Sequence, residues 1–260
     1  MASMRLKEAL GVRHGEMVSF IGAGGKTTSL FWLASELRAE GSKLLVTTTT
    51  KIFRPAKPHV DRLFLIDDVN ALLTESAGMT PPVIIGVGRS VDADGKLIGL
   101  PVSWLQPLHA SGQFDGILIE ADGAASRLFK IPAESEPVVP ESSTLVIWVM
   151  SIKAVGKPLD SRFVHRAERA VGLLNVAPET PFSRAHIVQL LQHPLGPLKG
   201  IPVGCRKIAL LNQADTANEV EEAQRLAEAM APLGLERIVI SSFVNGEPLK
   251  QIVSPERSLQ

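Results

Sequence analysis

The segment Gly22-Ala-Gly-Gly-Lys-Thr-Thr28 brings together the residue types that bind a phosphate chain. Glycines let the backbone curl so that its N–H groups point at an anion, and they place no Cβ in the way. Lys26 is spaced to reach the β- and γ-phosphates of a nucleoside triphosphate, ATP or GTP. The hydroxyl of Thr27 is expected to bind Mg²⁺, and Thr28 to bond near the α-phosphate. The nucleotide-binding residues predicted here are Gly22, Ala23, Gly24, Gly25, Lys26, Thr27 and Thr28.

The loop is shorter than the common phosphate loop. The common pattern has a glycine five residues before its Gly-Lys pair, and Phe20 occupies that position here. The remaining pattern, Gly-x-x-Gly-Lys-Thr-Thr, is similar to the shorter loop of the muramyl ligases. A buried strand over 17–21 and a helix with apolar residues at helical spacing flank the loop, which is the context that phosphate binding requires.

A second chemical feature is the acidic end of an apolar strand, Ile117-Leu-Ile-Glu120, followed by Ala121 and Asp122. The carboxyl ends of parallel strands meet at one edge of a sheet, so these acids should lie near the phosphate loop. One of them is expected to hold Mg²⁺ together with Thr27, and the spacing does not decide between Glu120 and Asp122. The predicted catalytic residues are therefore Lys26, Asp122 and Glu120.

Two further segments could bind an anionic group. Thr47–Thr50 end another predicted strand and precede Lys51 and Arg54, so a cradle of Thr48, Thr49, Thr50, Lys51 and Arg54 is one interpretation, and a plain strand is the other. His165 and Arg166 are expected to open a helix over 165–174. Cations at a helix start oppose the helix dipole, which hints at an anionic ligand, although a solvated basic face explains them as well.

The segment Asn212-Gln-Ala-Asp215 follows an apolar strand and has the shape of a nucleobase-reading loop. Guanine-specific phosphate-loop proteins carry Asn-Lys-x-Asp at such a place. Gln213 stands where that pattern has lysine, so the choice between ATP and GTP stays open. Asn212 and Asp215 are predicted nucleotide-binding residues, and ordinary capping of the next helix is the alternative interpretation.

Along its length the chain alternates short apolar runs with helical patterns. Strands are predicted at 17–21, 43–46, 63–66, 83–87, 117–120, 145–149, 207–211 and 237–240. Continuously apolar strands separated by helices indicate a parallel sheet that is covered on both faces. We expect an α/β fold with a three-layer, phosphate-loop type, mostly parallel sheet, formed by a single domain over 1–260. Residues 151–206 depart from this alternation and are predicted to be a largely helical insertion, with helices at 165–174 and 184–192. A further helix is predicted over 216–233.

Composition excludes several classes of protein. The 260 residues carry 27 basic and 27 acidic side chains, which argues against a broad electrostatic grip on nucleic acid or on an anionic membrane. No apolar run approaches the ~20 residues of a membrane span, so we expect a cytoplasmic protein without membrane partners. Cys205 is the single cysteine, which rules out an internal disulfide framework.

Together the motifs resemble those of the selenium-dependent hydroxylase accessory proteins, also called selenium cofactor biosynthesis proteins. The resemblance is carried by Gly22–Thr28, Val46–Pro55, Glu120–Ala125, Gly156–Leu159 and His165-Arg166, in that order. Leu211–Asp215 looks like the family's Leu-Asn-Lys-x-Asp, with Gln213 as a departure. The resemblance implies a role in the maturation of molybdenum hydroxylases that carry selenium. Its implied partners are a molybdenum-cofactor enzyme or another maturation protein.

Three hypotheses for function follow. The first is a maturation factor that binds and hydrolyses a nucleoside triphosphate with Mg²⁺. The second is a small-molecule kinase or ATP-dependent ligase, in which Lys51, Arg54, His165 and Arg166 hold an anionic acceptor. The third is a binding module that does not hydrolyse nucleotide. They differ in what stimulates turnover: a partner protein, a small acceptor, or nothing.

Overall fold

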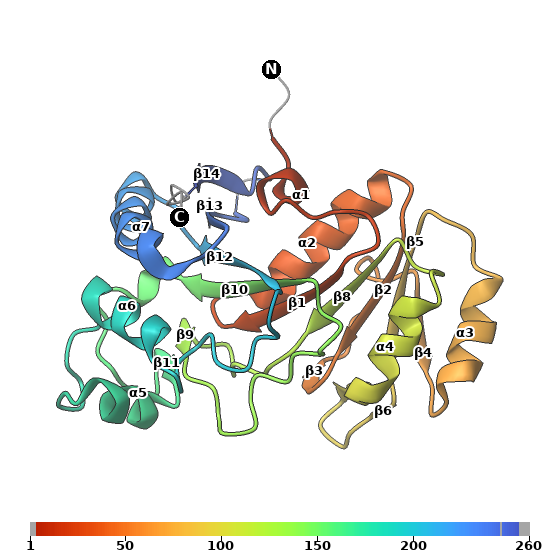
Figure 1. The fold of residues 1–260 in the computed structure, drawn as a ribbon, viewed down its shortest axis with the longest axis horizontal. Coiled ribbons are helices and arrows are strands. Elements are labelled where there is room, and N and C mark those ends of the chain that lie inside the picture. The colour runs from red at the N-terminus through yellow and green to blue at the C-terminus, as the bar shows by residue number, and fades with distance from the viewer. Residues whose placement is uncertain (1–3, 245, 255–260) are drawn as a thin grey trace.

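A nine-stranded sheet forms the centre of the computed structural model, which describes residues 4–244 and 246–254 (Figure 1). Eight neighbouring strands run parallel, and the edge strand β14 runs antiparallel to β13. The expected α/β fold with a mostly parallel sheet is confirmed. From one edge to the other the strands are β4 (Arg62–Leu65), β5 (Val83–Gly88), β2 (Lys43–Thr48), β8 (Gly116–Glu120), β1 (Met17–Gly22), β10 (Leu145–Ser151), β12 (Arg206–Asn212), β13 (Arg237–Ser241) and β14 (Leu249–Val253).

Helices cover both faces of this sheet because the central strands are apolar on both sides. Phe20 and Ile21, neighbours in β1, point into two separate buried clusters. The Phe20 cluster is closed by α1 (Leu6–Ala9) and α2 (Lys26–Ala39). The Ile21 cluster takes in α3 (Val69–Ala77), α4 (Val102–Ala110), α5 (Ala167–Leu174), α6 (Arg184–Gln192) and α7 (Ala217–Met230).

Strand β1, which leads into the glycine-rich loop, lies at the centre of the sheet. Strands β8 and β2 lie on one side of β1, and β10 and β12 lie on the other. In open α/β sheets, the crevice outside the carboxyl ends of the strands, at such a reversal of strand order, is where ligands bind. The loop between β1 and α2 therefore stands at the place that the topology favours for a site.

Two small sheets lie beside the large one and were absent from the predictions. Strands β3 (Lys51–Phe53), β7 (Lys96–Ile98) and β6 (Ser90–Val91) form an antiparallel sheet in that order, here called the β3–β7–β6 ribbon. The backbone N–H groups of Gly99 and Leu100 donate to the carbonyls of Thr50 (2.8 Å) and Thr48 (2.9 Å) and tie the ribbon to the end of β2. Strand β9 (Phe129–Lys130) pairs with β11 (Val164–His165) in the second small sheet.

The segment between β10 and β12 contains the short 3₁₀ turn Ile152–Ala154, β11, α5 and α6. Helix α6 has the predicted bounds, and the Ser183 hydroxyl caps it by accepting the N–H of His186 (3.2 Å). The prediction that His165 and Arg166 open a helix is wrong. His165 belongs to β11 and pairs with Lys130 of β9. Arg166 has a left-handed backbone (φ 61°), so α5 begins at Ala167.

The remaining differences from prediction concern elements without a strong apolar pattern. Helices α1, α3 and α4 and strand β14 were not predicted, and β14 lies only half buried at the edge of the sheet. The helix predicted over 216–233 is α7, with Thr216 as its cap, followed by a 3₁₀ turn over Ala231–Leu233.

Within residues 4–244 and 246–254, no helix combines the length and apolar character needed to span a membrane.

Arg206 joins three segments at the end of the sheet opposite the loop. Its guanidinium donates to Glu236 Oε2 (2.7 Å), to Glu16 Oε1 (2.7 Å) and to the carbonyl of Gly11 (2.9 Å). Hydrogen bonding from Arg206, opposed by partial burial, lowers the pKa of Glu236 below its ordinary value.

We expect Arg206→Met to lower the free energy of unfolding at pH 7 by about 2–4 kcal/mol, because Glu16 is buried and would lose its partner. The part due to Glu236 is present above the ordinary glutamate pKa of about 4.3 and is lost as pH falls through the lower pKa of the folded state. Urea unfolding at pH 7 and pH 3 should therefore show the difference shrinking in acid. Arg162→Met, which removes a surface pair with Asp160, is the control and should leave the free energy of unfolding nearly unchanged at both pH values. An equal loss at both pH values would contradict this account.

Candidate functional site

The glycines of the loop are required by its close approach to the ends of two strands. Gly22, Gly24 and Gly25 have positive φ angles of 95°, 73° and 116°. An added Cβ would lie 2.3 Å from the Val149 carbonyl oxygen at Gly22, and 2.2 Å from the Ser151 nitrogen at Gly24. At Gly25 it would lie 2.3 Å from the Asn212 side chain. The loop is thus pressed against the ends of β10 and β12, with no room for side chains at these positions.

Three of the loop's backbone N–H groups hold the loop rather than face a ligand. Gly22 donates to Asp122 Oδ2 (3.0 Å), Ala23 to the Val149 carbonyl (2.8 Å), and Gly24 to the Arg127 carbonyl (2.9 Å). Gly22, Ala23 and Gly24 therefore shape the loop, and their amides are not free for a phosphate in this structure.

The amides that remain are those at the start of α2. Gly25 is the N-cap in a left-handed conformation, no side chain caps the helix, and its first turn contains no acidic residue. The N–H groups of Gly25, Lys26, Thr27 and Thr28 lack partners within the helix, as the first four of any helix do. A helix start of this kind carries partial positive charge and donors that suit an anion.

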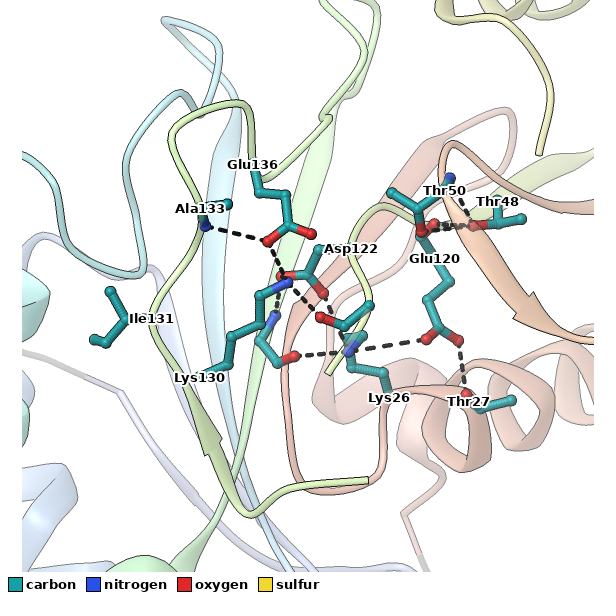
Figure 2. Close-up of polar contacts among 12 residues, drawn as sticks. Lys26, Thr27, Thr48, Thr50, Glu120, Asp122, Lys130, Ile131, Ala133 and Glu136 are labelled. Atoms are coloured by element: carbon teal, nitrogen blue, oxygen red, sulfur yellow. Dashed lines mark hydrogen bonds and ion pairs between the residues drawn. The ribbon is translucent and has the colours of Figure 1, made fainter. Parts of the chain in front are cut away.

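Lys26 is turned toward the loop and the acidic strand end (Figure 2). Its Nζ donates to the Gly22 carbonyl (2.6 Å) and lies 3.1 Å from Asp122 Oδ1 and 3.8 Å from Glu120 Oε1. Lys26 is only 4% exposed. The three predicted catalytic residues are thus brought together around one buried ammonium group.

The two acids differ in position. Glu120 lines a cavity beside the loop and accepts a hydrogen bond from the Thr27 hydroxyl (2.7 Å), whereas Asp122 lies behind the loop and holds the Gly22 amide. Burial raises the pKa of Glu120 above its ordinary value, against the opposing effect of Lys26. Geometry therefore separates the pair that the sequence could not: Glu120 faces the cavity, and Asp122 supports the loop.

Thr27 and Glu120 are the residues whose chemistry fits Mg²⁺. Both offer hard oxygen atoms at the cavity wall, and Mg²⁺ commonly binds one or two protein oxygens plus phosphates and waters. Within the described part of the chain, no group of three or more His, Cys, Asp or Glu residues could hold a metal alone. The arrangement suits a cation that arrives with phosphate.

Lys130 is a functional candidate that the sequence analysis missed. Its Nζ lies 3.2 Å from Asp122 Oδ2 and 2.8 Å from Glu136 Oε2, and it donates to the Gly123 carbonyl (Figure 2). Burial would raise the pKa of Glu136, but hydrogen bonds from Lys130 and Arg166 outweigh it and lower that pKa. The signal available was a lysine inside the apolar run Leu128-Phe-Lys-Ile131, which indicates a buried and paired cation.

The threonine hydroxyls bond the backbone instead of forming an open cradle. The hydroxyl of Thr48 donates to the Glu120 carbonyl (2.7 Å) and that of Thr49 to the Val138 carbonyl (2.8 Å), while Thr50 donates its N–H to the Thr48 hydroxyl (3.0 Å). These contacts dock the end of β2 against the end of β8. Lys51 lines the cavity, but Arg54 lies in a separate groove formed by residues 54–63.

His165 lines the cavity as well, although Arg166 does not. Burial, with Arg166 and Lys130 nearby, lowers the pKa of His165, so its imidazole is neutral at physiological pH. Arg166 bonds Glu136 (2.8 Å) and the Ile131 carbonyl (3.2 Å). The structure thus gives Arg166 an internal partner and leaves His165 at the cavity wall.

The Asn212–Asp215 segment supports the loop from the side of β12. Asn212 donates to the Gly24 carbonyl (2.8 Å) and accepts from Ser241 (3.1 Å). Asp215 accepts from Lys153 and Ser242, both at 2.6 Å; burial opposes the ionisation of Asp215, but these bonds outweigh it and lower its pKa. Gln213 lines the cavity. Asn212 therefore acts on the loop backbone, and base preference stays a prediction.

The cavity outside the loop has a volume of about 700 Å³. One wall is the start of α2 with Glu120, a second is the turn after β8, and a third is the β3–β7–β6 ribbon. Ala125 and Ser126 in the turn both have left-handed backbones (φ 46° and 56°), a conformation held where surroundings impose it. The lining residues are Gly24–Thr28, Lys51–Phe53, Lys96, Glu120, Gly123–Leu128, Glu136, His165 and Gln213.

Fold and site together define an α/β protein whose glycine-rich loop and acidic strand end meet at the carboxyl edge of a mostly parallel sheet. Comparison with known proteins gives the family. The sequence model described as YqeC protein matches residues 18–168, more than half of the chain. An uncharacterized protein YqeC of Escherichia coli (strain K12) is 34% identical over 217 residues, which cover 84% of this chain and 82% of that relative. The chain therefore belongs to the YqeC family. The matched range contains the loop, the threonines, the acidic strand end and His165, and Asn212–Asp215 lies beyond it.

The packing of the loop predicts that Gly24→Ala is much more damaging than the same change at a glycine with equal backbone strain but open surroundings. Gly112 is that control: its φ is 65°, against 73° at Gly24, and a Cβ there would meet nothing within 4 Å. Gly112→Ala should cost about 1–2 kcal/mol for the left-handed backbone alone. Gly24→Ala should cost about 2–5 kcal/mol, because overlap with the Ser151 backbone adds to that strain. Equal losses in denaturant unfolding would show that the loop has room to move away from β10.

Proposed function

We propose that this protein is a maturation factor for selenium-dependent molybdenum hydroxylases that binds and hydrolyses a nucleoside triphosphate. The observation that carries the nucleotide half is the uncapped start of α2, whose free amides lie beside Lys26 and the Thr27–Glu120 pair at the wall of a cavity of about 700 Å³. Donors, a cation and hard oxygen ligands on one wall are the parts that phosphate and Mg²⁺ need together.

Each residue has a role in this proposal. The N–H groups of Gly25–Thr28 donate hydrogen bonds to the phosphate chain, and the Lys26 side chain turns from the Gly22 carbonyl toward the β- and γ-phosphates. Thr27 and Glu120 hold Mg²⁺, which when bound neutralises part of the phosphate charge. Asp122 keeps Lys130 as a partner 3.2 Å away when Lys26 turns outward, so its buried charge does not become unpaired.

The maturation half is supported by family membership and by the motifs. The resemblance to selenium-dependent hydroxylase accessory proteins rests on segments within 22–166, all of which the YqeC match covers. The partner proposed on this ground is a molybdenum-cofactor enzyme or another maturation protein.

A small-molecule kinase or ligase is the second candidate, and one observation favours it. The cavity extends past the start of α2 to Lys51, Phe53 and Lys96 on the ribbon, which gives room and charge for an acceptor. Release of the nucleoside diphosphate product, measured for the protein alone, with a candidate partner protein and with small acceptors, separates these functions. Stimulation by the protein supports the maturation factor, stimulation by an acceptor supports the kinase or ligase, and no release at all leaves a binding module.

Nucleotide binding is tested by calorimetric titration with ATP and with GTP, each with and without Mg²⁺. We expect one nucleotide to bind in a Mg²⁺-dependent manner. Thr27→Val should weaken that binding about ten- to a hundredfold, the range expected when a bond to a charged group is lost. Lys26→Ala should abolish it.

Thr74→Val is the matched control, since the hydroxyl of Thr74 bonds only its own helix at Asn70. Circular dichroism must show that the Lys26 variant is folded, because that substitution leaves Asp122 and Glu120 with one cation fewer. Binding of Mg²⁺-nucleotide by Thr27→Val as tight as by the wild type would overturn the metal assignment. Tight binding of nucleotide by folded Lys26→Ala would overturn the assignment of the loop as a phosphate-binding loop.

A further inference from the structure

Phe53 is an aromatic ring that folding leaves exposed on the wall of the cavity. Its exposed fraction is 75%, whereas its neighbour Ile52 is 7% exposed and anchors the strand. Phe53 lines the same cavity as the phosphate-binding start of α2. An aromatic ring left open in a cavity wall offers a flat surface on which a planar ligand can stack.

Two lysines flank this ring on the same face of the ribbon. Lys51 and Phe53 are two residues apart in β3, so their side chains share a face, and Phe53 pairs directly with Lys96 of β7. The Lys96 ammonium lies 5.9 Å from the centroid of the Phe53 ring, within the range of a cation–π contact. Lys51 keeps 59% of its side chain exposed beside Asp92, and both lysines line the cavity.

The ribbon is held at a fixed place relative to Glu120. An added Cβ at Gly99 would lie 2.1 Å from the Thr48 carbonyl oxygen, so the ribbon presses directly on the end of β2. Thr48 in turn donates its hydroxyl to the Glu120 carbonyl, and Thr49 donates its N–H to the same oxygen (3.2 Å). These contacts thus link the ribbon, which contains Phe53, to the acidic strand end.

The ribbon and the Asn212–Asp215 segment lie on opposite sides of the loop. The ribbon follows β2 and the segment follows β12, and each of these strands is two places from β1 in the sheet. A nucleotide that extends from the start of α2 toward Gln213 leaves the Phe53 side of the cavity free for another molecule.

The charges of the cavity favour an anion in that space. Its lining contains four cationic side chains, Lys26, Lys51, Lys96 and Arg127, against the two carboxylates Glu120 and Glu136. Glu136 is already paired with Lys130 and Arg166. On the ribbon side, Lys51 is paired with Asp92 (3.1 Å) but keeps most of its side chain exposed. Lys96 and the exposed Lys51 therefore supply positive charge that the phosphate loop does not use.

We propose that the cavity binds a second ligand, a planar aromatic anion, which stacks on Phe53 with its charge between Lys51 and Lys96. The inference rests on the proposed function only in placing a nucleotide on the opposite wall. It goes beyond that function by naming the chemical class of a second ligand for the same cavity.

The test uses 1-naphthyl phosphate as probe, with 1-naphthol and inorganic phosphate as the ring alone and the anion alone. Each is titrated into the full-length protein, first without nucleotide and then with a non-hydrolysable nucleotide and Mg²⁺. We expect 1-naphthyl phosphate to bind better than either part. Phe53→Ala should weaken it about five- to a hundredfold, the range for loss of a stacking ring. Phe53→Trp should retain binding, and Lys96→Gln should weaken 1-naphthyl phosphate but not 1-naphthol.

Leu195→Ala, which truncates another exposed apolar side chain, is the control and should leave probe binding unchanged. Nucleotide binding is measured on the same samples, so failure of the nucleotide site is seen separately from failure of the proposed site at Phe53. No binding of 1-naphthyl phosphate to the wild type overturns the proposal, as does equal binding by Phe53→Ala. A loss of nucleotide binding in Phe53→Ala also overturns it, because the ring would then stack on the nucleobase.

Discussion

The buried carboxylate of Asp122 is the group on which the rest of the site depends. It is only 2% exposed; its Oδ2 accepts a hydrogen bond from the Gly22 N–H, and it forms ion pairs with the ammonium groups of Lys26 and Lys130. A carboxylate so far from water is tolerated only with cations and donors around it. These contacts fix the turn of the loop and hold the Lys26 side chain beside the cavity. They also place Lys130 of the short strand β9 against Asp122. Glu120 is left free to face the cavity with Thr27.

The second organising contact is the set of hydrogen bonds to the Glu120 carbonyl, where the end of β2 docks on the end of β8. Thr48 and Thr49 both donate to the Glu120 carbonyl, and the Gly99 and Leu100 amides fasten the ribbon to the same strand end. Glu120 thus contributes to two walls of the cavity. Its side chain accepts a hydrogen bond from Thr27, and its carbonyl accepts from the end of β2, to which the ribbon is fastened.

Much of the fold followed from the sequence because apolar runs are strong local signals. The central strands and helices α6 and α7 were predicted at nearly their observed bounds, and a helix was expected where α2 lies. The meeting of Lys26, Glu120 and Asp122 was predicted as well. Elements held by pairing with distant segments carried no such signal: β9, β11 and the ribbon are two or three residues long and depend on their partners. For the same reason the sequence suggested that the threonines and Arg166 bind a ligand, whereas carbonyls and Glu136 occupy them. Nucleotide binding itself stays a prediction.

The placement of β12 beside β10 has a consequence for dissecting this protein. Apart from Gln213, every residue that lines the cavity lies between positions 24 and 165. Yet β10 is buried along its whole length, and β12 covers its outer edge over seven paired residues. A fragment ending near residue 168 would contain almost the entire cavity wall and would also expose an apolar strand edge, the typical template for aggregation. The carboxyl-terminal third of the chain thus contains the strand that covers the edge of β10, and the cavity cannot be isolated without it.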